Sequence, residues 1–353
     1  MDKIEKLRKA FRENDLDAIL ITSPYNRRYI TNFTGTAGVA IVSKDEARFV
    51  TDFRYIEQAN EQAADFKIVE HKQPIHQAIN EQLKELGVHK VGFEKEHVTF
   101  ATYELYKESM DVKLVPVSGL IEELRLIKTA EELEVLKQAA KIAEDAFTHI
   151  QGYIKPGVKE IDISNELEFH MRNLGAESSS FDTIVASGYR GALPHGVASD
   201  KKIQSGELVT LDFGAYYNGY CSDITRTVAV GELSDELTTI YNIVQKAQKI
   251  GVEGLKPGIT GIEADALTRN YIIEKGYGDY FGHSTGHGVG LEVHEGPGLS
   301  FRSEKKLAPG MVVTVEPGIY VPDVGGCRIE DDIVITEKGY ERLTLAPKEL
   351  ITL

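Results

Sequence analysis

The first third of the chain alternates short apolar runs with amphipathic stretches, as a regular α/β fold does. Apolar runs between turn residues predict strands at 17–22, 39–43, 47–52, 66–70, 90–93 and 112–117. Apolar positions three and four residues apart predict helices at 2–13, 55–63, 74–86 and 99–107. No Gly-rich phosphate loop lies in this region, so we expect a sheet domain without a catalytic constellation of its own.

The segment Thr51–Tyr55 follows a predicted strand and allows two interpretations. The simpler one is a capping turn, in which Asp52 caps the helix that follows. The alternative is that this turn reaches the site of a partner chain.

The pattern becomes strongly helical and charged at 121–150. Thr129, followed three residues later by Glu132, has the spacing of a capping box at the start of a long helix. The chain of 353 residues is also longer than one typical domain. We therefore predict two domains, 1–123 and 124–353.

The second domain contains an internal repeat. Lys155-Pro156-Gly157 recurs 101 positions later as Lys256-Pro257-Gly258, and Pro194-His195-Gly196 recurs 92 positions later as Gly286-His287-Gly288. The strand before Asp212 likewise recurs before Glu316, 104 positions later. Three matches in one order at similar offsets predict two half-domains related by a pseudo-twofold axis, with a site at their junction.

Each half ends in a hairpin that carries two carboxylates. In the first, Asn218-Gly219 predicts a two-residue turn that sets position 223 opposite position 214, so Asp212 and Asp223 share one face. In the second, Glu316 stands before a Pro-Gly break, and a return strand brings Glu330 back towards it. Four bare carboxylates on one interior face would repel each other strongly, whereas two divalent cations would balance their charge and leave room for a bridging hydroxide. Oxygen-rich ligands favour a hard ion such as Mn²⁺.

Histidines complete the candidate site. Only ten are present, and His283, His287 and His294 lie close together in a Gly-rich loop that cannot form a regular helix. Such a group beside an acidic cluster points to a metal ligand together with proton-handling residues. His195 is the fourth candidate and comes from the other half.

Composition excludes several classes of protein. The net charge of −15 argues against binding nucleic acid or an anionic membrane surface. The N-terminus lacks the features of a signal peptide, and no apolar run is long enough for a membrane span. Two cysteines are too few for a disulfide framework, so we expect a reduced, cytoplasmic setting.

The ordered set of candidate residues resembles the metal-dependent aminopeptidases of the pita-bread fold, and within them aminopeptidase P and the Xaa-Pro dipeptidases (prolidases). The resemblance covers nearly the whole chain, and the motifs are Pro194-His195-Gly196, Asp212, Asp223, His283-x-x-x-His287, His294, Glu316-Pro317-Gly318 and Glu330. It implies a creatinase-like α/β domain followed by an α+β pita-bread catalytic domain. It also implies a homodimer in which the N-terminal domain shapes the neighbour's pocket.

The resemblance also implies individual roles. Asp212 would chelate one of two divalent ions, Asp223 and Glu330 would bridge the two, and His287 with Glu316 would complete the shell of the other. The ions would be Mn²⁺, with Co²⁺ or Zn²⁺ possible. Glu316 would also shuttle a proton, His294 would stabilise the oxyanion, and His195 would contact the substrate amide. His283 would line the proline pocket.

Two arginines bear on substrate choice. Arg302 falls where prolidases place an arginine that binds a free C-terminal carboxylate, which favours a dipeptidase; in a Lys/Glu-rich stretch it could equally be a solvated surface residue. Arg328 matches a family arginine near the site, or it forms a plain ion pair with an acid. The alternatives are an aminopeptidase P acting on longer peptides, and a metal-free creatinase-type hydrolase, which should lack several of the five ligands.

Overall fold

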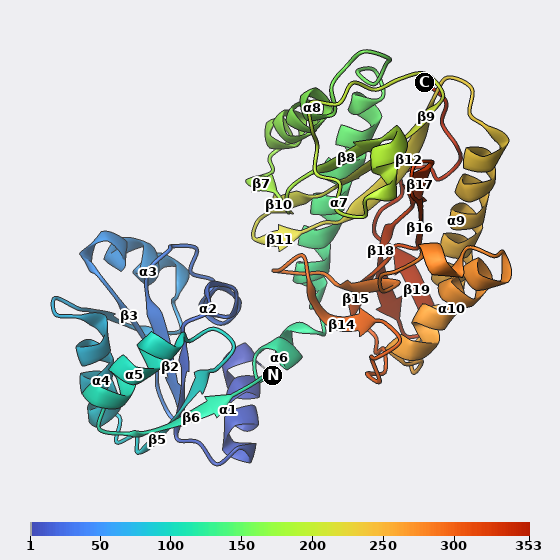
Figure 1. The fold of residues 1–353 in the computed structure, drawn as a ribbon. Coiled ribbons are helices and arrows are strands. Elements are labelled where there is room, and N and C mark those ends of the chain that lie inside the picture. Colours follow the sequence, from blue (N-terminus) through green and yellow to red (C-terminus); the bar gives the residue numbers. More distant parts are fainter. Residues whose placement is uncertain (1) are drawn as a thin grey trace. The chain divides into compact units, whose positions relative to one another are not determined.

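The structure is a computed structural model that describes residues 2–353. Its contacts divide the chain into two compact units, Met1–Arg125 and Leu126–Leu353, which are described separately (Figure 1). Among the described residues, no helix combines the length and apolar character that crossing a membrane requires.

The first unit is a six-stranded mixed sheet with helices around it (Figure 1). The strand order is β4-β3-β2-β1-β5-β6. The strands are β1 (Ala18–Ile21), β2 (Val39–Ser43), β3 (Ala47–Thr51), β4 (Lys67–Glu70), β5 (Lys90–Glu94) and β6 (Lys113–Val117). The helices are α1 (Lys3–Glu13), α2 (Pro24–Thr31), α3 (Ile56–Gln62), α4 (Ile75–Glu85), α5 (Phe100–Ser109) and α6 (Glu122–Arg125), with a 3₁₀ turn η1 (Phe53–Tyr55).

All six predicted strands and four predicted helices of this unit are confirmed to within about two residues at each end. The helix α2 was missed, although Ser23 caps it by accepting a bond from the Asn26 amide and Pro24 occupies its first turn. Asp52 accepts a bond from the Arg54 amide, as a capping residue should.

The second unit surrounds several small sheets with four long helices. The helices are α7 (Ala130–Ile150), α8 (Glu160–Asn173), α9 (Asp235–Gly254) and α10 (Gly261–Glu274). The strands before α9 are β7 (Ser178–Ser179), β8 (Ile184–Ser187), β9 (Glu207–Phe213), β10 (Ala215–Tyr217), β11 (Tyr220–Cys221) and β12 (Ile224–Val230). Those after α10 are β13 (Gly286–Gly288), β14 (Glu295–Leu299), β15 (Val312–Val315), β16 (Gly318–Val321), β17 (Gly325–Arg328), β18 (Asp331–Thr336) and β19 (Gly339–Arg342). Two 3₁₀ turns, η2 (Gly188–Ala192) and η3 (Gly278–Tyr280), complete it.

The helices of this unit cover the outer faces of the sheets. In the first half, α7 and α8 pack on each other and bury their apolar side chains against β8, β9 and β12. In the second half, α9 packs on α10, and both contact strands of the C-terminal sheets (Figure 1). Thr129 and Glu132 form the predicted capping box at the start of α7.

The predicted internal repeat is present in the backbone. Gly157 and Gly258, which end the two Lys-Pro-Gly turns, both have φ of +93°. Their amides donate equivalent bonds of 2.8 Å to the carbonyls of Ile203 and Leu307. Equal conformations and equal long-range bonds in two stretches 101 residues apart confirm the fold class, an α/β domain followed by a pseudo-symmetric α+β domain.

Candidate metal centre

The first hairpin has the register that the sequence predicts. Tyr217 pairs with Tyr220 across the Asn218-Gly219 turn, and Phe213 pairs with Ile224, so position 223 lies opposite position 214. Asn218 and Gly219 have φ of 47° and 81°, as a type I′ turn requires. Asp212 and Asp223 are therefore diagonal neighbours on one face.

The second hairpin repeats this arrangement. Val315 pairs with Asp331 and Gly318 pairs with Arg328, which leaves Glu316 and Glu330 opposite each other between the two paired segments. In each hairpin one carboxylate, Asp223 in the first and Glu316 in the second, lies in the short link where the chain passes from one sheet to the next. Backbone that is free of a regular ladder there lets the side chains converge.

All four carboxylates line one cavity of about 610 Å³. The same cavity is lined by His195, His283, His287, His294 and Arg328. Its apolar wall is formed by Phe181, Ile184, Pro194, Val197 and Val293. The structure thus brings together nine of the ten predicted site residues.

Arg302 is the exception. It is exposed and is not among the residues that line the cavity; its guanidinium lies 5.0 Å from the centre of the Phe301 ring. Ser300, two residues before Arg302, does line the cavity, so the chain leaves the cavity lining just before Arg302. The predicted contact with a substrate carboxylate stays a prediction.

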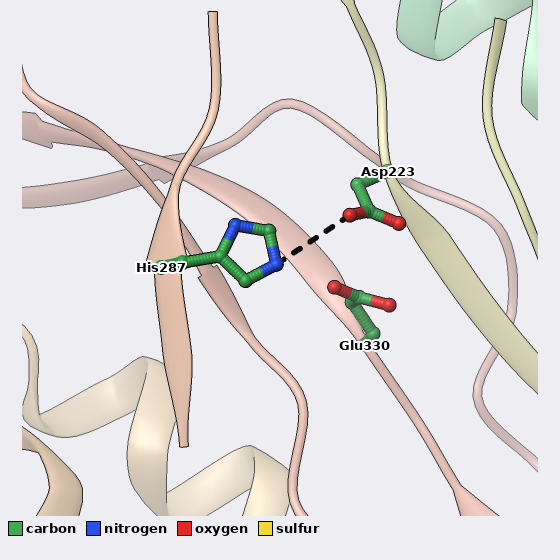
Figure 2. Close-up of side chains that lie close together, drawn as sticks. All are labelled: Asp223, His287 and Glu330. Atoms are coloured by element: carbon green, nitrogen blue, oxygen red, sulfur yellow. Dashed lines mark ion pairs between the residues drawn. The ribbon is translucent and has the colours of Figure 1, made fainter. Parts of the chain in front are cut away.

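His287 is oriented towards the acids. Its Nδ1 lies 3.0 Å from the Gly288 carbonyl, which can only accept, so Nδ1 carries a hydrogen and Nε2 is the nitrogen that could bind an ion after losing its proton. That Nε2 lies 3.7 Å from Asp223 Oδ2 and 3.2 Å from Glu316 Oε1. Figure 2 shows His287, Asp223 and Glu330 pointing towards a common space from three separate segments, and one potential ligand atom from each lies within 4.8 Å of the others.

A hydrogen-bonded chain connects His283 with the first half. His283 Nδ1 donates to the Ser284 carbonyl over 2.8 Å, so its Nε2 accepts the Tyr320 hydroxyl at 2.8 Å. Arg328 donates to the Tyr320 hydroxyl over 2.7 Å and to Asp212 Oδ2 over 2.5 Å. Arg328 is thus an ion-pair partner of a candidate ligand and is itself buried.

The other two histidines lie at the exposed side of the cavity. His195 is exposed on the loop after η2, and His294 is exposed with its ring centre 4.3 Å from that of His287. Partial desolvation of its ring and the charge of the neighbouring His287 lower the pKa of His294 below its ordinary value, so it is neutral at pH 7. A neutral imidazole can both donate and accept a proton.

The carboxylates differ in how easily they ionise. Burial, followed by the charges of neighbouring acids, raises the pKa values of Asp223 and Glu330 well above their ordinary range. Burial also opposes ionisation of Glu316, but the hydrogen bond and charge of His287 outweigh it and lower the pKa of Glu316 to about 2. The same contact with Glu316 raises the pKa of His287 against the effect of its own burial.

The donor set fits divalent cations. Asp212 Oδ1, Asp223 Oδ1 and Glu330 Oε1 are buried and have no hydrogen-bond partner in the described part of the chain. Unpaired buried carboxylate oxygens are costly, and a cation would satisfy them and remove their mutual repulsion. Four carboxylates and one imidazole are ligands that suit Mn²⁺ and similar ions.

The sequence analysis missed several residues that hold the ligands in place. Thr225 Oγ1 donates to Glu330 Oε2 over 2.6 Å, Thr314 Oγ1 donates to Glu316 over 3.1 Å, and Asp332 accepts the Asp223 amide at 2.9 Å. Each lies two positions from a ligand along an extended segment. Side chains two residues apart share a face of a strand, so this spacing could have found them.

The fold and the site define a class of protein, and comparisons with known proteins agree. Residues 134–337 match the model of metallopeptidase family M24, and residues 3–127 match that of the creatinase/prolidase N-terminal domain. The chain belongs to metallopeptidase family M24. The predicted enzyme class, a hydrolase of a metallopeptidase family, is confirmed at the level of the family.

Particular relatives resemble it over nearly their whole length. The Xaa-Pro dipeptidase of Pyrococcus furiosus is 45% identical over 99% of both chains. The structure of an Xaa-Pro dipeptidase from Bacillus anthracis superimposes with a TM-score of 0.99 at 62% identity, over 99% of both chains. The structure of an X-Pro aminopeptidase from Thermotoga maritima superimposes with a TM-score of 0.92 at 39% identity, over 98% of this chain and 100% of that one.

Proposed function

We propose that this protein is an Xaa-Pro dipeptidase that uses two divalent metal ions, most simply Mn²⁺. The observation that supports this most is the convergence of Asp212, Asp223, His287, Glu316 and Glu330 on a single cavity. Relatives that match the whole chain are named Xaa-Pro dipeptidases. One relative named as an aminopeptidase keeps the question of peptide length open to experiment.

Each ligand residue has a role in this proposal. Asp212 would hold one ion, His287 and Glu316 would hold the other, and Asp223 and Glu330 would serve both. The chemistry that the ions would supply when bound is polarisation of the scissile carbonyl and a lowered pKa of water at the site. Arg328 holds Asp212 in place, and Thr225 does the same for Glu330.

The remaining residues would handle protons and substrate. Glu316 is ionised, so it can accept the proton that the attacking water loses. The neutral His294 at the cavity mouth would donate a hydrogen bond to the oxygen of the scissile carbonyl as negative charge develops there. His195, from the opposite half, would contact the amide around the leaving nitrogen. The apolar wall that includes Phe181 and Val293 suits a proline ring, which carries no amide hydrogen to be bound.

Three further features complete the proposal. The two domains would be 1–123 and 124–353, close to the division into two compact units. A homodimer, in which the N-terminal domain shapes the neighbour's pocket, would limit the length of the bound peptide together with Arg302. A cytoplasmic location would suit the two buried cysteines, Cys221 and Cys327, which are unpaired.

The test is a comparison of Ala-Pro, Ala-Pro-Ala and longer Xaa-Pro peptides with protein reconstituted with Mn²⁺. We expect cleavage of Ala-Pro only. Cleavage of the longer peptides would make the protein an aminopeptidase P, and cleavage of neither would refute the assignment. Arg302→Ala separates the contribution of Arg302 to length preference from that of the neighbour's N-terminal domain. It should raise KM for Ala-Pro while leaving kcat nearly unchanged.

A further inference from the structure

Three consecutive acids lie where β18 begins: Glu330 directly precedes the strand, and Asp331 and Asp332 are its first two residues. Among these three described residues, Asp331 is the one that forms ion pairs with basic side chains. Glu330 and Asp332 face the metal centre, where they contact Thr225 and the Asp223 amide. Asp331 points to the opposite face of the strand, where its carboxylate is fully buried. A buried carboxylate on the back of a strand is costly unless partners compensate it.

The partners of Asp331 are three positively charged side chains. Arg226 Nη2 lies 2.7 Å from its carboxylate, Lys348 Nζ 2.5 Å and Arg342 Nε 3.1 Å. Gln248 of α9 donates a further bond over 2.9 Å. Three cations around one anion exceed what neutralisation of Asp331 alone requires.

Arg226 joins this cluster to the strands that carry the ligands. It comes from β12, where it faces away from the metal centre, whereas its neighbour Thr225 faces towards it. Its guanidinium donates to the backbone carbonyls of Thr225, over 2.9 Å, and of Glu330. Its other donors reach the carbonyls of Ala346, at 2.8 Å, and Pro347, at 3.0 Å. All five N–H groups of the guanidinium are therefore engaged, which a lysine could not reproduce.

The charge pattern of the metal centre alone does not define the register of β18. A slip by one residue would turn Asp331 towards the ions and both neighbouring acids away from them. Because all three residues are acids, the front of the strand would still present a carboxylate after the slip. The cations behind the strand would then lose the carboxylate that they now contact, so the cation cluster favours the observed register.

We propose that Arg226, Arg342 and Lys348 act as a register lock on β18: by pairing with Asp331 behind the strand, they select Glu330 as the ligand that faces the metal ions. Asp331 is thus a positioning residue, although it touches neither ion nor substrate. Lys348 extends the lock to the last residues of the chain, whose backbone pairs with Ala229 of β12 through Ile351 and Leu353. This inference rests on the proposed metal site.

The test measures metal binding rather than turnover. Chelator-treated protein is titrated with Mn²⁺ by calorimetry, bound ions are counted by native mass spectrometry, and the melting temperature is recorded in chelator. Asp331→Asn should weaken Mn²⁺ binding by about ten- to a hundredfold, as loss of outer-shell partners does. Lys348→Met, which leaves two cations in place, should weaken binding by a smaller factor of about three.

Two controls separate positioning from stability. Glu337→Gln removes one exposed charge from the β18–β19 turn and should leave the binding constant within about twofold of the wild type. Tyr241→Phe removes a 3.1 Å bond to the Lys348 carbonyl without touching Asp331, so it should lower the melting temperature and not the Mn²⁺ affinity.

The outcomes are distinct. A wild-type protein that binds no Mn²⁺ refutes the proposed function itself. Wild-type affinity in folded Asp331→Asn, or in Lys348→Met should Asp331→Asn not fold, overturns the register lock. A lower melting temperature in either variant with unchanged affinity also overturns it, because the cluster would then be purely structural.

Discussion

The two halves of the catalytic unit have the same backbone plan but supply different chemistry. Both contain a Lys-Pro-Gly turn with the same φ and the same long-range bond, and both end in a hairpin that carries two carboxylates. Yet the two Pro/Gly-His-Gly motifs differ: His287 points Nε2 at the acids, while His195 lies exposed at the rim. The repeat therefore provides a symmetric frame for the acids, and the histidines break the symmetry.

The carboxylates that the two hairpins contribute should be the positions most sensitive to mutation. Asp223→Ala removes a carboxylate that both ions are proposed to share, so peptide hydrolysis should fall by about a thousandfold or more. Turnover of Ala-Pro and circular dichroism are the measurements. A folded, active Asp223→Ala protein would break the comparison, because the first hairpin would then not be part of the site.

The two equivalent histidines should respond differently. His287→Ala should reduce the number of bound Mn²⁺ ions as well as turnover, whereas His195→Ala should keep both ions and lower turnover by about a hundredfold. Ion counting by native mass spectrometry alongside kcat distinguishes the two. Loss of an ion in His195→Ala would mean that the halves are more symmetric than the structure indicates.

Arg328 is the side chain of the second half that contacts Asp212 of the first, and it also holds the Tyr320 hydroxyl. Arg328→Lys keeps the charge but cannot maintain both bonds in one plane, so we expect a loss in kcat/KM of about tenfold. Lys338→Arg, a change between basic residues at an exposed position of the β18–β19 turn, is a matched control and should remain within about twofold of the wild type. An unaffected Arg328→Lys would show that the halves need no link beyond the ions.

In the metal-free protein, the dependence of stability on pH should report on the buried acids of both halves. Burial raises the pKa of Asp332 to about 8, and it raises those of Asp223 and Glu330 as well, so the folded protein binds protons that the unfolded chain has already released. Stability conferred by a raised pKa is present below the unfolded value, near 4, and is lost as pH rises through the folded one. In chelator, the melting temperature should therefore fall between about pH 4 and pH 8, and Mn²⁺ should reduce this dependence. A melting temperature in chelator that rises across this range would contradict the buried, proton-sharing site.

The smallest expected effect concerns the turns that define the repeat. Gly157→Ala and Gly258→Ala each place a side chain at φ of +93° where no other atom lies within 4 Å, so only backbone strain is added. Each should lower the free energy of unfolding by about 1 kcal/mol, without loss of activity. Denaturant unfolding of both variants measures this, and clearly unequal losses would argue that the two turns are not equivalent.

Much of this frame could be predicted from the sequence because it is encoded locally. The Asn218-Gly219 turn specifies a register, and the register places Asp212 and Asp223 together without any long-range information. The Pro-Gly break after Glu316 acts in the same way. Recurrence of short motifs at similar offsets then reveals the pseudo-symmetry.

What could not be predicted depends on contacts between distant segments. Tyr320 links His283 to Arg328, and Arg226 reaches the carbonyls of Ala346 and Pro347, about 120 positions away. No local spacing indicates these bonds. Arg302 shows the converse: a position suggested by likeness to a family lies outside the cavity lining in the isolated chain.

One measurement tests the central claim most directly, namely the number of Mn²⁺ ions bound to each chain in native mass spectrometry. The account predicts two ions on the wild-type protein and fewer on Asp223→Ala, which comes from one hairpin, and on Glu330→Ala, which comes from the other. Two ions retained by both variants, or none on the wild type, would contradict a site shared by the two halves.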